Sequence, residues 1–154
     1  MLVVLTEGLR TVLVAFLGLA AGFTWYATRT AMIPPASPDR LVAELRLSQF
    51  GALLLAMTAA VYIGFAVTFE RQPGVGLDVA FAVGFFVIAA TAMLRDPRQG
   101  LTMLAIAFAV HALLDVAHRP GLLPDAIAPR WYLIGCATYD VYIGALCYIP
   151  ILRR

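Results

Sequence analysis

Long apolar runs separated by short polar breaks dominate the pattern along this chain. Each run approaches the ~20 residues that an α-helix needs to cross the ~30 Å hydrocarbon core of a bilayer. The runs cover roughly residues 4–27, 47–70, 76–94, 98–118 and 131–152. The pattern predicts an all-α, polytopic membrane protein in which five transmembrane helices form one bundle, with a single integral membrane domain over residues 1–154.

Prolines, glycines and capping residues mark where these helices should begin and end. Ser37 can cap a helix whose first residue is Pro38, and we expect that helix to continue unbroken into the second run. Asp96-Pro97 repeats this signature before the fourth run. Gln72-Pro73-Gly74 and Arg119-Pro120-Gly121 predict the turns after the second and fourth runs.

Composition indicates the same class of protein. The chain is 62% hydrophobic and 13% charged, whereas soluble domains average about 25% charged residues. Its net charge of +2 is too small to indicate a nucleic-acid partner. Cys136 and Cys147 lie on one predicted helix, roughly 16 Å apart, too far for a mutual disulfide. We expect both to be buried thiols that fill space.

Arginines fall unevenly on the two sides of the predicted bundle. The side with the 28–46 connection, the 95–98 turn and the C-terminus carries seven arginines and the other side four. The positive-inside rule then predicts a multi-pass protein of the cell inner membrane with its N-terminus outside and its C-terminus in the cytoplasm.

Other polar and small residues near the helices receive simpler interpretations. We expect Asp78 to be a solvated loop charge at the outer interface, together with Glu70 and Arg71. Gly18 and Gly22, four residues apart, form a small-residue motif that lets helices approach closely. We expect this motif to pack within the chain, with a dimer seam as the alternative.

Ionisable side chains inside the fourth span are the main functional signal. At 100° per residue, Asp115 lies about 40° from His111, and His118 lies about 20° on its other side, so all three share one stripe. Such side chains are costly at bilayer depth and by default mark a functional site in the bundle interior.

Asp140 in the fifth span is expected to face this stripe. His111 lies about 10 Å and Asp140 about 13 Å below the outer ends of two consecutive, antiparallel helices. By the same measure, Asp115 lies near the level of Cys136. Gly144, one turn beyond Asp140, lets the neighbouring helix approach.

A metal site is the preferred interpretation of these residues. Imidazoles and carboxylates suit a divalent transition metal, Zn, Mn or Fe, and the candidate ligands are His111, Asp115, His118 and Asp140. The stripe on the fourth helix spans about 10 Å, so a single ion cannot easily contact all three of its residues. Asp115 is then either an orienting group or a ligand of a second ion.

Two alternatives remain open at this point. The same groups could form a hydrogen-bond network that binds an organic ligand or relays protons. They could also be a satisfied polar pin that fixes helix pairing.

The C-terminal third resembles a family of small bacterial integral membrane proteins classed as a domain of unknown function. The shared pattern is His-x3-Asp-x2-His at positions 111–118, a proline-containing loop, then Gly-Cys-Ala-x2-Asp at positions 135–140. The match covers roughly residues 108–148. Family members often have Trp and a second His where this chain has Leu114 and Arg119, so one potential metal ligand is missing. The resemblance implies a site without implying an activity.

These observations favour a small metal-dependent membrane enzyme that acts on a lipid or isoprenoid-like substrate. Its candidate catalytic residues are Asp115 and Asp140, with an aspartate or a metal-bound water as the base. The alternative is a non-catalytic accessory subunit or ligand-binding membrane protein whose polar stripe is structural and pins helices or a cofactor. Candidate partners in either case are the lipid bilayer, a lipid-like ligand, and a homo-oligomer or larger membrane complex. An enzyme needs an open coordination position and an apolar cleft that reaches the bilayer, whereas a subunit needs a lipid-level face covered by partner helices.

Overall fold

The computed structural model describes residues 2–68, 74–118, 122–123 and 128–152. This part of the chain contains only helices as regular structure, and each is long and apolar enough to cross a membrane. They are α1 (Leu2–Met32), α2 (Pro38–Thr68), α3 (Val75–Met93), α4 (Pro97–Ala117) and α5 (Arg130–Leu152). The predicted all-α bundle of five candidate spans is confirmed.

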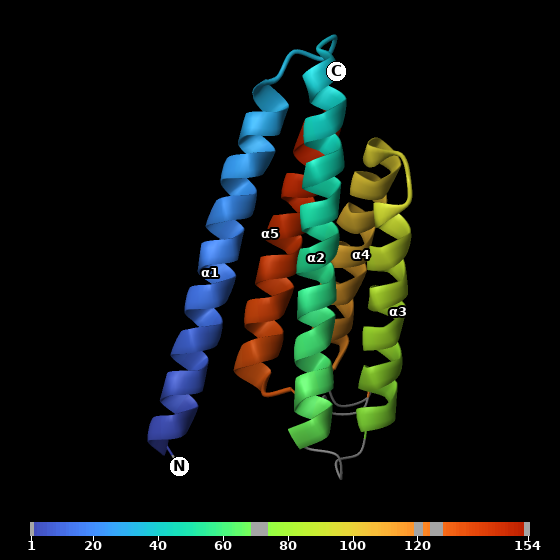
Figure 1. Ribbon diagram of the computed structural model, residues 1–154. Coiled ribbons are helices and arrows are strands. Elements are labelled where there is room, and N and C mark those ends of the chain that lie inside the picture. Colours follow the sequence, from blue (N-terminus) through green and yellow to red (C-terminus); the bar gives the residue numbers. More distant parts are fainter. Residues whose placement is uncertain (1, 69–73, 119–121, 124–127, 153–154) are drawn as a thin grey trace.

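The helices alternate in direction, so α1 begins and α5 ends at opposite ends of the bundle (Figure 1). We call these the N-terminal and C-terminal ends. Helix α2 packs against each of the other four helices, whereas α1 and α3 lie on opposite flanks and do not contact each other (Figure 1). Helix α1 diverges from the bundle toward its own N-terminus (Figure 1).

The predicted helix starts are confirmed. Ser37 Oγ accepts a hydrogen bond from the backbone N–H of Asp39 at 3.3 Å, and α2 runs unbroken from Pro38 to Thr68. Asp96 Oδ1 accepts from the N–H of Arg98 at 3.1 Å at the start of α4. Residues 72–73 and 119–121 of the two predicted turns lie outside the described residues.

Helices α4 and α5 pack most closely where the candidate site lies. A Cβ added to Gly144 would stand 3.2 Å from Phe108 Cβ and 3.3 Å from the carbonyl oxygen of Ala105. These distances are shorter than ordinary van der Waals contact, so a larger side chain here would require α4 or α5 to shift by a few tenths of an ångström. The expected role of Gly144 is confirmed.

The small-residue motif of α1 does not pack within the chain, and that expectation is wrong. No atom of the described residues lies within 4 Å of where a Cβ of Gly18 or Gly22 would stand. Helix α1 instead faces the bundle through Phe23 and Ala27, both fully buried. Because Gly22 directly precedes Phe23, it projects about 100° away from that contact stripe.

Ion pairs around the buried Glu44 join several helices at the C-terminal end. Arg40 Nε lies 2.7 Å from Glu44 Oε1, and Arg98 Nε lies 3.1 Å from Glu44 Oε2. Arg40 also donates to the carbonyl oxygens of Ile33 at 2.6 Å and Pro150 at 2.7 Å. We call Arg40, Glu44 and Arg98 the C-terminal ion cluster. It connects the ends of α1 and α5 to α2 and α4.

Candidate functional site

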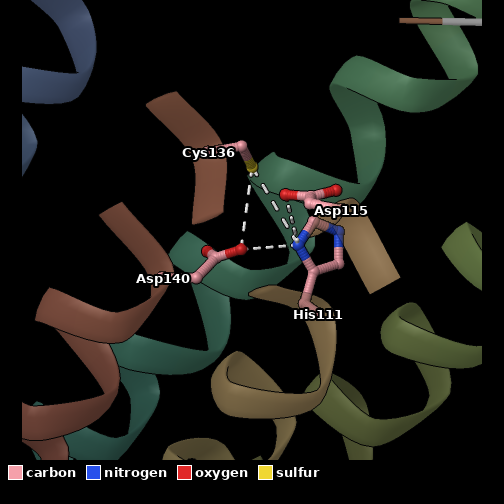
Figure 2. A group of neighbouring side chains, drawn as sticks. All are labelled: His111, Asp115, Cys136 and Asp140. Atoms are coloured by element: carbon pink, nitrogen blue, oxygen red, sulfur yellow. Dashed lines mark hydrogen bonds and ion pairs between the residues drawn. The ribbon is translucent and has the colours of Figure 1, made fainter. Parts of the chain in front are cut away.

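His111 of α4 and Asp140 of α5 meet inside the bundle, as their depths predicted. His111 Nδ1 lies 2.6 Å from Asp140 Oδ2, and both residues are buried (Figure 2). Charged groups buried among apolar helices persist when they are paired. The polar stripes of α4 and α5 therefore face each other in the folded protein, and the pairing of His111 with Asp140 keeps their charges in the bundle interior.

Asp115 extends this pair by one turn of α4. Its Oδ2 lies 3.7 Å from His111 Nδ1, and its other oxygen, Oδ1, accepts a short hydrogen bond from the hydroxyl group of Tyr62 on α2. The ring of Tyr62 also stands edge-on to the His111 ring, with centroids 5.6 Å apart, and the Phe85 ring does so at 4.6 Å. Helices α2 and α3 thus hold both His111 and Asp115 in place.

Cys136 is a member of this site rather than only a space-filling thiol. Its Sγ lies 3.7 Å from Asp140 Oδ2 and 3.9 Å from His111 Nδ1. Figure 2 shows His111, Asp115, Cys136 and Asp140 pointing toward one another, and the possible ligand atoms of these four buried residues all lie within 4.8 Å. We call them the His/Asp/Cys cluster. The sequence contains one signal that could have assigned Cys136 to the site, which is that it precedes Asp140 by one helical turn and so lies on the same face of α5.

The cluster contains more hydrogen-bond acceptors than donors. Asp115 Oδ2 and Asp140 Oδ1 are buried and accept no hydrogen bond from the part of the chain that is described. His111 can supply at most one positive charge to the two carboxylates. Because an unbalanced charge in an apolar interior is costly, the arrangement favours a bound cation or an additional proton.

His118 lies outside this cluster. It caps the C-terminal end of α4, and its Nε2 is 3.3 Å from Asp78 Oδ1 at the start of α3. The expectation that Asp78 is a solvated loop charge is wrong, because only 1% of its surface is exposed. Helix α3 already begins at Val75, which places Asp78 in its first turn and against α4. Glu70 and Arg71 lie outside the described residues.

A small void lies between the pair of His118 and Asp78 and the pair of His111 and Asp115. It measures about 10 Å³, and its lining includes Asp78 and His118 on one hand and His111 and Asp115 on the other. This volume is close to the minimum that holds a single water molecule. The His118 pair is thus a neighbour of the cluster and not one of its members.

A larger groove lies between α1 and α5 and reaches the cluster from the other side. Its volume is about 760 Å³, and it is lined mainly by apolar and aromatic side chains, including Phe16, Ala20, Trp25, Trp131 and Cys136. Of the four cluster residues, Cys136 alone lines this groove. The structure therefore contains the apolar cleft that a lipid-active enzyme requires.

Comparisons with family models, curated proteins and solved structures find no match to this chain. The resemblance of residues 108–148 to a family of small bacterial membrane proteins stays a prediction.

Proposed function

We propose that this protein is a metal-dependent membrane enzyme acting on a lipid or isoprenoid-like substrate. The observation that carries the proposal is a pair of buried carboxylate oxygens, Asp115 Oδ2 and Asp140 Oδ1. They lie beside an imidazole and a thiol, and no described residue donates a hydrogen bond to either oxygen. A divalent cation would leave His111 neutral and offset two of the three negative charges carried by Asp115, Asp140 and a Cys136 thiolate. Among the described residues, the arginine ion pairs are those of Arg40 and Arg98 with Glu44 at the other end of the bundle, and none involves Asp115 or Asp140.

The donor set favours zinc or iron over manganese. Thiolate and imidazole ligands suit Zn²⁺ and Fe²⁺, whereas Mn²⁺ prefers oxygen ligands. Ligand atoms around a tetrahedral zinc ion stand about 3.4 Å apart, given metal–ligand bonds of about 2.0–2.3 Å. Asp140 Oδ2 and His111 Nδ1, now hydrogen-bonded at 2.6 Å, would have to separate slightly to admit the ion.

We assign Asp115 the role of a base beside the ion, and the Asp115→Asn variant described below tests this assignment against a ligand role. Tyr62 holds one of its oxygens, and the other lies 3.7 Å from His111 Nδ1. His111, Cys136 and Asp140 would then hold the ion and leave a coordination position open, as catalytic zinc sites do. The ion would supply Lewis-acid polarisation of a substrate oxygen, and Asp115 would accept a proton nearby.

Elemental analysis of the detergent-purified protein tests this proposal. We expect about one zinc or iron ion per chain in the wild type and a loss of at least about ten-fold in His111→Ala and Cys136→Ala. Cys147→Ala is the matched control, because Cys147 is a buried, free cysteine on the same helix but outside the cluster. Folded wild-type protein that binds no zinc or iron, either as purified or after both ions are added, would overturn the proposal and favour the hydrogen-bond network.

Asp115→Asn separates the enzyme from its runner-up. If Asp115 is a base, the variant keeps its ion. If the ion content falls as far as in His111→Ala, four side chains close the coordination shell, which is typical of structural zinc sites. That result would favour the non-catalytic accessory subunit.

A further inference from the structure

The groove between α1 and α5 has the dimensions of a lipid-tail site. Along α5 its lining runs from Trp131 to Tyr142, about 17 Å at 1.5 Å per residue, which is roughly half the ~30 Å core of a bilayer. Its volume of about 760 Å³ lies within the range of ~300–1,000 Å³ for ligand pockets. A partner helix would occupy the full thickness of the bilayer, so a groove of half that length suits a lipid chain better.

The lining of this groove carries no charge. None of the described residues that line it is Asp, Glu, Arg, Lys or His. A phosphate or carboxylate drawn into the groove would give up its hydration without meeting a cation, which is costly. The groove therefore selects against charged lipid groups along its length.

Two buried hydroxyl groups lie behind the wall of the groove, on residues one turn of α5 on either side of Cys136. Tyr132 and Tyr139 both line it, and their hydroxyl groups are buried without a hydrogen-bond partner among the described residues. Buried hydroxyl groups are normally hydrogen-bonded, so a small rotation of either ring toward the groove would let its hydroxyl group donate to an acceptor oxygen next to Cys136. The apolar remainder of such a ligand would follow α1 and α5 toward Trp25.

We propose that this groove binds an uncharged, long-chain lipid with an alcohol, ester or ketone oxygen placed beside Cys136. The proposal rests on the proposed function only in identifying this lipid as the substrate. Cys136 belongs to both the groove and the His/Asp/Cys cluster, so a lipid oxygen there lies next to the metal ligands. Phosphorylated isoprenoids and phospholipid headgroups are not the groups that this groove takes up.

Tryptophan fluorescence can test the proposal directly, because both tryptophans of the chain, Trp25 and Trp131, line the groove. The probe is dibromostearyl alcohol, whose bromine atoms quench tryptophan on contact, added to metal-free protein in detergent. We expect saturable quenching that an excess of unbrominated stearyl alcohol relieves. Dibromostearyl phosphate should bind at least about ten-fold more weakly, because its charge meets no cation in the groove.

A pair of glycine substitutions provides the matched control. Gly135 lines the groove, and no atom stands within 4 Å of its Cβ position, so Gly135→Leu fills the groove without a clash. Gly84 on α3 is equally open and lies outside the groove. Both substitutions improve helix propensity. Gly135→Leu should abolish saturable quenching, and Gly84→Leu should leave it unchanged.

Three results would overturn this proposal. They are quenching that does not saturate, equal quenching by the alcohol and the phosphate, and a dimer that Gly135→Leu converts to a monomer, which would make the groove an interface between copies. Because the assay uses metal-free protein, its failure is separate from that of the metal site. Saturable binding by a protein that never holds metal would leave the lipid site standing and reject the enzyme.

Discussion

Glu44 is buried between two arginines at one end of the bundle, whereas Asp115 and Asp140 are buried around one histidine in the opposite half. Both oxygens of Glu44 accept from arginine, at 2.7 Å and 3.1 Å. Asp115 and Asp140 each keep one buried oxygen without a donor from the described residues. The two clusters therefore differ in whether the protein alone can satisfy them.

This difference is the reason why we propose a structural role for the C-terminal ion cluster and a binding role for the His/Asp/Cys cluster. Arg40 uses its remaining donors on the carbonyl oxygens of Ile33 and Pro150, near the ends of α1 and α5. Such carbonyls lack partners within their own helices, so Arg40 acts as a cap for two helices at once. The His/Asp/Cys cluster caps no helix end. Its surplus of acceptors has no structural use within the described chain, which is what a site for an exchangeable cation requires.

Removing the charge of Glu44 should produce the largest loss of stability. Glu44→Gln removes the negative charge that lies 2.7 Å from Arg40 Nε, a group only 2% exposed, and we expect the protein to lose about 3 kcal/mol of unfolding free energy. Unfolding in mixed detergent micelles measures this loss. Asp39→Asn, at an exposed position of the same helix, is the control and should change little. A Glu44→Gln protein as stable as the wild type would contradict a structural role for the C-terminal ion cluster.

Asp140→Asn should lower the ion content without lowering the stability, in contrast to Glu44→Gln. The variant keeps the volume of Asp140 but loses its charge, and we expect the ion content to fall at least about ten-fold. Stability should be unchanged or higher, because a neutral amide is cheaper to bury than a carboxylate. Elemental analysis and thermal unfolding in one detergent give both quantities. Asp96→Asn, exposed at the start of α4 and also a good helix cap, is the control. Unchanged ion content with equal or higher stability would count against the site.

The fold and the central contact of the site could be predicted because each depends on distance along a helix. Bilayer thickness sets the length of an apolar span, and capping residues such as Ser37 and Asp96 locate helix starts. The pairing of His111 with Asp140 follows from counting 1.5 Å per residue along two consecutive antiparallel helices. No packing detail is needed for that step.

The sequence analysis missed residues whose contacts are set by how each helix is rotated about its own axis. Helices α2 and α3 are apolar on nearly all faces, so their sequences contain no clear stripe that shows which face meets α4. Tyr62 and Asp78 therefore could not be assigned to partners before the bundle was assembled. Cys136 was predictable in position but not in role, because a thiol in an apolar helix is equally a space-filling side chain.

The pair of His118 and Asp78 should be mainly structural, with a smaller effect. His118→Gln can still donate a hydrogen bond to Asp78, so we expect a loss of about 1 kcal/mol or less, similar to other interhelical hydrogen bonds in membranes. The ion content should remain that of the wild type. A fall as large as that in Asp140→Asn would instead make His118 a metal ligand, as its place on the α4 stripe predicted.

The orientation of the two clusters can be tested without disturbing either. Pro38 is exposed beside the C-terminal ion cluster, and Leu122, 74% exposed, follows α4 at the other end. With the N-terminus outside, a membrane-impermeant maleimide should label Leu122→Cys in intact cells but label Pro38→Cys only after permeabilisation. The native Cys136 and Cys147 can stay because they are buried, and unsubstituted protein measures their background. The reverse pattern would place the His/Asp/Cys cluster in the cytoplasmic half. The arginine asymmetry would then reflect helix capping by residues such as Arg40, and not the direction of insertion.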